Sequence, residues 1–197
     1  MLVSDFYINS GLSLFGPVYA IFVAGNIEGA TIATVGFAAA ISQIVKVCLE
    51  IPISRYLDKN HGEYDDYYSL IIGNYIIALV PFLYLFASKV HHIYLIEALM
   101  GVGVACAVPP WHAIFSRHLD KNEENFEWSL KSISIGLAIA GAAAVGGLLA
   151  QRFGFDIVFV LGGIIALIGA FVQIRIYKDL KGKVPRGQVH PQAQLPK

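Results

Sequence analysis

The fold is decided by residues 155–177, FDIVFVLGGIIALIGAFVQIRIY. A helix of about 20 apolar residues crosses the hydrocarbon core of a bilayer, and this stretch is long and apolar enough to do so. Stretches of the same kind recur along the chain, and we predict six transmembrane helices at residues 6–25, 31–54, 67–87, 91–115, 127–150 and 155–177. The predicted fold class is an all-α membrane protein, in which residues 1–178 form a six-helix transmembrane bundle.

The composition of the whole chain agrees with this prediction. Of its 197 residues, 56% are hydrophobic and only 14% are charged, whereas about a quarter of the residues of a soluble domain are charged. The lipid bilayer is therefore an expected partner. The formal net charge is zero, so no basic field would attract nucleic acid, and we expect no nucleic-acid partner.

The distribution of Lys and Arg predicts the orientation of the bundle. Six crossings place both ends on one side, and the connections then form two sets. One set, with the C-terminal tail, contains Arg55, Lys59, Arg117, Lys121, Lys131, Arg175, Lys178, Lys181, Lys183, Arg186 and Lys197. The opposite set contains only Lys89 and Arg152. The positive-inside rule thus predicts an integral protein of the plasma (inner) membrane with both termini in the cytoplasm.

The two ends of the chain differ in character. Residues 1–45 contain no Lys or Arg, so we expect the first apolar segment to be a retained helix and not a cleaved signal. Residues 179–197 are rich in Pro, Gln, Gly and Lys, and we expect a disordered cytoplasmic tail, either a terminus or a linker.

Polar side chains inside the predicted spans are the candidate solute or ion pathway, because such groups are costly in lipid. Lys46 and Glu50 lie one helical turn apart and can form a pair that faces a cavity, or Lys46 can extend to the membrane surface. Glu97 is either an interfacial carboxylate or a proton-titrating group. The uncharged candidates are Asn9, Tyr19, Gln43, Asn74 and Tyr75.

Small residues in the fifth and sixth spans predict faces where helices pack closely. They are Gly136, Ala140, Gly141, Ala144, Gly146 and Gly147 in the fifth span, and Gly162, Gly163, Ala166, Gly169 and Ala170 in the sixth.

No pattern in the sequence indicates catalysis. The chain lacks GxGxxG, GxxxxGK[ST], HExxH and GxSxG, so we expect neither an enzyme nor a cofactor. His112, His118 and Asp120 match no standard metal site and are expected at a hydrated helix end. Cys48 and Cys106 show no metal or disulfide spacing and are expected to be packing residues.

The connection after the second span resembles the signature loop of the Major Facilitator Superfamily, which runs roughly PxGxLADRxGR. Residues 51–59 read IPISRYLDK, where Asp58 matches the signature acid and Lys59 the following basic residue. Ser54 and His61 stand in place of its two glycines. The resemblance implies that Arg55, Asp58 and Lys59 belong to a cytoplasmic gate.

Three further segments are similar to the same family. Residues 97–103, EALMGVG, resemble its RxxxGxG pattern with Glu97 in place of Arg, and residues 141–147 resemble its glycine-rich antiporter motif without the Gly-Pro pair. Residues 152–159, RFGFDIVF, resemble its turn between the fifth and sixth spans.

The resemblance implies a secondary active transporter of a small solute. Members of the family normally contain two six-helix bundles, and one bundle is present here. We therefore expect either a homodimer or half of a longer transporter with a second six-helix unit. The alternative is a membrane scaffold or sensor that retains the fold without transport.

Overall fold

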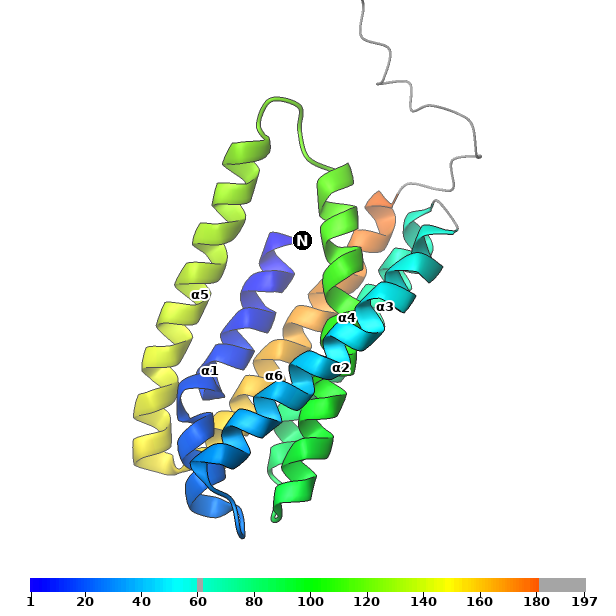
Figure 1. Cartoon of the computed structure of the whole chain (residues 1–197). Coiled ribbons are helices and arrows are strands. Elements are labelled where there is room, and N and C mark those ends of the chain that lie inside the picture. Colours follow the sequence, from blue (N-terminus) through cyan, green and yellow to red (C-terminus); the bar gives the residue numbers. More distant parts are fainter. Residues whose placement is uncertain (60–61, 181–197) are drawn as a thin grey trace, which may run out of the picture.

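The computed structural model describes residues 1–59 and 62–180, which form six long helices and a short 3-10 helix (Figure 1). All six long helices are apolar enough to cross a membrane, which confirms the predicted six-helix membrane bundle. Residues 181–197, most of the expected disordered tail, lie outside the described residues. The elements are α1 (Leu2–Asn26), α2 (Ile32–Asp58), α3 (Glu63–Tyr84), α4 (Val90–Arg117), α5 (Glu124–Phe153), α6 (Phe155–Gln173) and η1 (Ile174–Asp179).

Local sequence explains where several helices begin and end. The side chain of Thr31 accepts a hydrogen bond from the backbone N–H of Thr34, and the Thr34 hydroxyl accepts one from the Thr31 N–H, so a capping box starts α2. Gly154 alone separates α5 from α6. Its φ of +85° is a conformation that side chains with a Cβ rarely adopt, and it lets the chain reverse within one residue.

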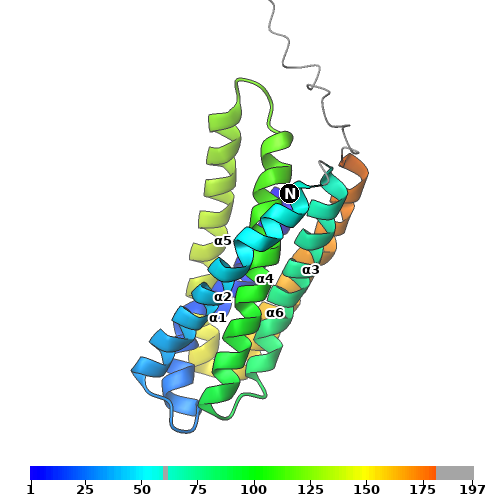
Figure 2. The same ribbon diagram turned by 45° about the vertical axis from the view of Figure 1, so that its right-hand side comes forward.

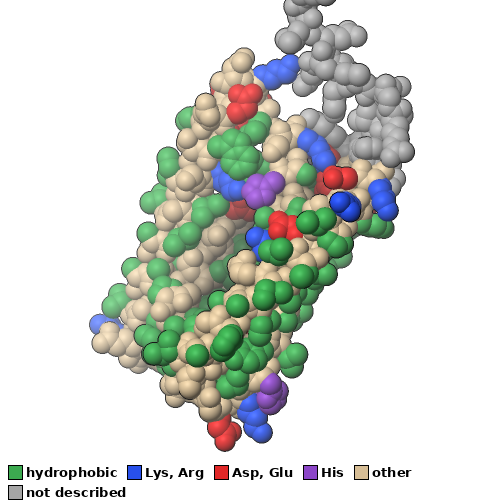
Figure 3. Space-filling view, in the orientation of Figure 1, with side chains coloured by type: hydrophobic (Ala, Val, Ile, Leu, Met, Phe, Trp, Pro, Cys, Tyr) green, Lys and Arg blue, Asp and Glu red, His purple; other side chains and the backbone are tan. Residues whose placement is uncertain are grey.

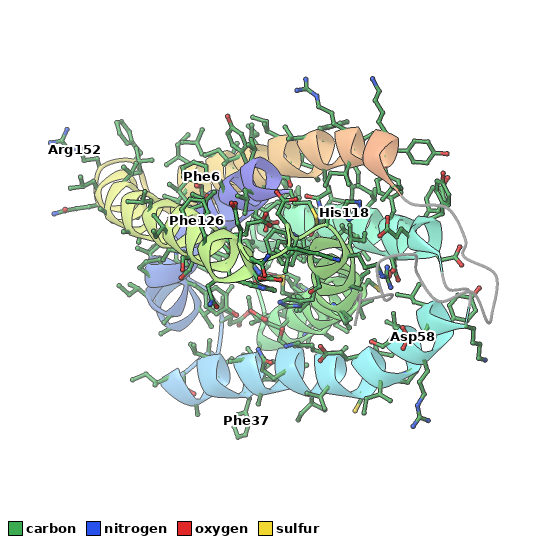
Figure 4. All side chains as sticks on the ribbon, turned by 90° about the horizontal axis from the view of Figure 1, so that it is seen from above. Phe6, Phe37, Asp58, His118, Phe126 and Arg152 are labelled. Atoms are coloured by element: carbon green, nitrogen blue, oxygen red, sulfur yellow. The ribbon has the colours of Figure 1, made fainter. Side chains whose placement is uncertain are left out.

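The helices form an open bundle in which α1 and α4 are central. Helix α1 packs against α5 and α6, α3 packs against α4 and α6, and α2 packs against α4. Figure 2 shows α2 lying obliquely across α4, and Figure 4 shows α2 and α6 at opposite edges with α4 between them. Residues of α1 and α4 face a common space between these two helices.

Glycines make the closest contacts of the bundle. A Cβ atom on Gly11 of α1 would lie 2.4 Å from the carbonyl oxygen of Gly162 in α6, and one on Gly146 of α5 would lie 1.7 Å from the carbonyl oxygen of Leu14 in α1. A Cβ atom on Gly163 of α6 would meet the Phe82 ring, and one on Gly169 would lie 2.8 Å from the carbonyl oxygen of Ser4, so the predicted close-packed face of the sixth span is confirmed.

The prediction for the fifth span is only partly right. Gly146 is buried against α1, but Gly136 and Gly141 have no atom of another part of the described chain within 4 Å of an added Cβ. Ala140 and Ala144 are also exposed. Helix α5 contacts the bundle along one narrow side only. Most of its small residues therefore lie in a stripe that faces outward.

Candidate functional site

The space between α1 and α4 is a cavity of about 210 Å³. Helix α3 contributes its inner wall and α5 one flank. Figure 3 shows Lys or Arg, acidic and His side chains gathered in the hollow between α5 and α2. The cavity is the best candidate for a functional site, because polar groups at membrane depth usually face a cavity or a partner.

Asp5, Trp111 and Lys131 form the charged end of the cavity. The Lys131 ammonium lies 3.4 Å from the centroid of the Trp111 ring and 4.9 Å from that of Trp128, which is a cation–π arrangement. Asp5 is 7% exposed, and its carboxylate is close enough to attract Lys131. The indole N–H of Trp111 lies near Asp5 but forms no hydrogen bond within the described residues.

Helical spacing brings these side chains to one place. Asp5, Asn9 and Leu12 lie on one side of α1, since residues three and four apart share a helix face. Val104, Val108 and Trp111 do the same on α4, and Lys131 and Ile135 on α5. The cavity thus combines a few polar groups with an apolar wall, the composition typical of small-molecule sites.

The residues predicted for the pathway divide into those that line this cavity and those that do not. Asn9 and Asn74 line it, and the Asn9 amide donates a hydrogen bond of 2.9 Å to the backbone oxygen of Asp5. Lys46 and Glu50 are half-buried on α2, where their charges act on the His112 ring at the cavity. Gln43 is exposed.

Tyr19 and Glu97 belong to a second polar cluster, away from the cavity. The Tyr84 hydroxyl donates a hydrogen bond of 2.8 Å to the Glu97 carboxylate, which is buried. The rings of Tyr19 and Tyr84 lie 5.3 Å apart, within an aromatic group that also contains Phe15 and Phe159. The cluster with its aromatic surround joins α1, α3, α4 and α6.

The residues predicted for the gate lie at the end of α2. Arg55, Asp58 and Lys59 are all exposed. The polar contacts at this end instead join α3 to the end of α4. Arg117 forms an ion pair with the buried Asp66, and the His118 ring lies 3.7 Å from the buried Glu63 carboxylate. The charge of Asp58 nevertheless acts on Asp66, so the two groups of charges are neighbours.

The sequence alone did not identify Asp5, Trp111 and Lys131. Lys131 was counted among loop charges, but it lies two turns inside α5 and faces the cavity. His112 and His118, which the sequence analysis considered together, lie in different places. His112 lines the cavity, and His118 lies beside Glu63. The signal that could have found the site is the i, i+4 pair of Asp5 and Asn9 in an otherwise apolar helix.

Comparison with known proteins identifies a family. Residues 2–195 match the family model described as the Major Facilitator Superfamily. No curated protein matches the chain.

Proposed function

This chain belongs to the Major Facilitator Superfamily, and from that premise we propose that it is one six-helix half of a secondary transporter whose solute binds in the cavity between α1 and α4. The family is one of transporters and not of enzymes. The proposed solute is small, in keeping with a cavity of about 210 Å³.

The observation that carries this proposal is the cavity, which brings charged groups from two candidate membrane-spanning helices together. Ionised side chains within such helices are costly in lipid and usually face a cavity or a partner. Asp5 and Lys131 line one cavity together with Asn9 and Asn74. In our proposal these four residues bind solute, while Lys46, Glu50 and Gln43 border its path and Tyr19 and Glu97 form a separate polar site.

The charged end of the bundle is proposed to face the cytoplasm of a plasma membrane. Figure 1 places the N-terminus, the α2–α3 and α4–α5 connections and η1 at the same end. If Lys131 is left out, ten Lys and Arg residues of the sequence still belong to the connections and tail at this end, and two belong to the connections at the opposite end. The positive-inside rule supports the cytoplasmic assignment. Arg55, Asp58 and Lys59, with the Arg117–Asp66 pair beside them, are then the proposed cytoplasmic gate.

A second bundle would complete the transporter, either from another copy of the chain or from a longer polypeptide. The exposed small residues of α5 support such a contact, since Gly136, Ala140 and Ala144 repeat every four residues, a spacing that lets helices approach closely in lipid. A copy in the same orientation, related by a two-fold axis along the membrane normal, would bring two such faces together.

The homodimer predicts that a large side chain on this stripe weakens association. Ala140→Phe is expected to shift the monomer–dimer equilibrium in bilayers about tenfold or more, because it separates the helices. Single-molecule photobleaching in lipid bilayers measures the equilibrium. Ile168→Phe on the exposed side of α6 is the matched control and should leave it unchanged. A wild-type chain that stays monomeric would exclude the homodimer and leave the second bundle to another polypeptide.

Transport itself can be tested before the solute is known. Proteoliposomes are incubated with a mixture of small metabolites, and their contents are analysed by mass spectrometry. We expect at least one solute to accumulate with wild type and with Arg152→Gln, which changes an exposed charge away from the cavity, and about tenfold less with Lys131→Met. Uptake of no solute, or equal uptake with Lys131→Met, would contradict the proposal and favour a scaffold or sensor.

A further inference from the structure

The cavity has two ends of different chemistry. Asp5, Trp111 and Lys131 lie at the end near the start of α1. Leu12 lies seven residues further along α1, which is about 10 Å along the helix axis, and Ile77 and Val104 join it in the apolar lining. A solute that fills the cavity therefore meets charged groups at one end and aliphatic side chains at the other.

The charges that line the cavity balance each other. Asp5 and Lys131 are the Asp and Lys side chains of its lining, and they contribute one charge of each sign. A solute with a single charge would leave an uncompensated charge in a site largely removed from water, which is unfavourable. A zwitterion adds no net charge, and its two poles can each find a partner.

Three groups at the charged end are available to such a solute. The Trp111 N–H is buried beside the Asp5 carboxylate and forms no hydrogen bond of ordinary geometry within the described residues. The Asp5 carboxylate is buried at the cavity wall. The Lys131 ammonium lies on the faces of aromatic rings, and no carboxylate in residues 1–59 and 62–180 forms an ion pair with it.

We propose that this cavity binds a small zwitterion of the α-amino-acid type with a short aliphatic side chain. The ammonium group of the solute binds the Asp5 carboxylate, its carboxylate accepts hydrogen bonds from Lys131 and the Trp111 N–H, and its side chain lies against Leu12, Ile77 and Val104. A cavity of about 210 Å³ favours a short side chain. This inference rests on the proposed transport function and names its substrate class.

Binding can be measured on the full chain in nanodiscs. The chain has two tryptophans, Trp111 and Trp128, so Trp128→Phe leaves Trp111 as the only fluorophore of that type, and equilibrium dialysis with radiolabelled solute gives a second readout. The probes are L-valine, 3-methylbutanoate, which lacks only the amine, and 2-methylpropylamine, which lacks only the carboxylate. L-valine should bind at least about tenfold tighter than either analogue.

Removing one of the two charged side chains of the cavity should reverse the ligand preference from the zwitterion to an analogue with a single charge. Asp5→Asn leaves Lys131 without its counter-charge, so this variant should bind 3-methylbutanoate more tightly than L-valine. Lys131→Met leaves Asp5 and should prefer 2-methylpropylamine. Arg152→Gln should keep the wild-type order, and thermal unfolding of each variant shows whether it is folded. A reversed ligand preference requires a folded cavity, so partial unfolding of a variant cannot produce it.

Two results would overturn the inference. One is an analogue with a single charge that binds wild type as tightly as L-valine. The other is the absence of saturable L-valine binding while proteoliposomes take up a different solute in a Lys131-dependent manner, in which case transport stands and the substrate class is wrong. If L-valine binds with the expected preferences but no solute enters the liposomes, the transport proposal fails and the zwitterion site stands.

Discussion

Gly146→Ala should destabilise the bundle more than any other single methyl group added to α5. Its Cβ would lie 1.7 Å from the carbonyl oxygen of Leu14 and 2.7 Å from the carbonyl carbon. Backbone atoms cannot turn aside as a flexible side chain can, so α5 must move away from α1. Overpacking of this kind costs about 1–3 kcal/mol, and we expect the upper end of that range in the free energy of unfolding.

The same movement should affect the cavity. Lys131 lies on α5, and its ammonium contacts the Trp111 ring on α4. When α5 shifts outward this contact lengthens, so a Gly146→Ala chain that still folds should also show a changed Trp111 fluorescence. Thermal unfolding in lipid bicelles, with tryptophan emission recorded before the transition, measures both effects.

Gly141→Ala is the matched control for this variant. It adds the same methyl group to the same helix, at a position where nothing in the described chain lies within 4 Å. Its free energy of unfolding should equal that of wild type or exceed it by up to about 1 kcal/mol, because alanine favours the helix more than glycine does. Equal losses in the two variants would show that α5 does not pack on α1 through Gly146.

Arg117→Met should give the second large effect, at the end of the bundle that we propose faces the cytoplasm. Arg117 forms an ion pair with Asp66, whose side chain is 6% exposed, and the buried Glu63 is a second carboxylate close by. Without the guanidinium, Asp66 keeps a buried charge beside another of the same sign. Breaking a fully buried pair costs about 3–5 kcal/mol, but Arg117 is 39% exposed, so water partly replaces it and we expect roughly 1–3 kcal/mol.

A double-mutant cycle tests whether the loss comes from the unpaired carboxylate. Asp66→Asn combined with Arg117→Met removes both charges and should regain much of the stability lost in Arg117→Met alone. Arg152→Met, at an exposed position in the last turn of α5, controls for the loss of a positive charge. Additive effects of Asp66→Asn and Arg117→Met would mean that the two side chains do not stabilise each other.

The sequence determined the helices because the bilayer leaves the backbone little choice. A segment that crosses hydrocarbon must satisfy its own hydrogen bonds, and a long apolar stretch such as residues 155–177 can do so only as a helix. Hydropathy is thus a local property that predicts a local structure. The family could be inferred from local sequence too. Residues 51–59 and 152–159 resemble its motifs, and the six predicted spans place these residues at the connections where the family has those motifs.

The tertiary structure decided which polar groups form a site. Asp5, Trp111 and Lys131 come from α1, α4 and α5, and no short-range pattern connects residues so far apart in the chain. Their meeting depends on which side of each helix faces the bundle. That depends in turn on contacts such as Gly146 on Leu14 and Gly11 on Gly162. Lys131 shows the consequence, because the same side chain counts as a loop charge in the sequence and lines the cavity in the fold.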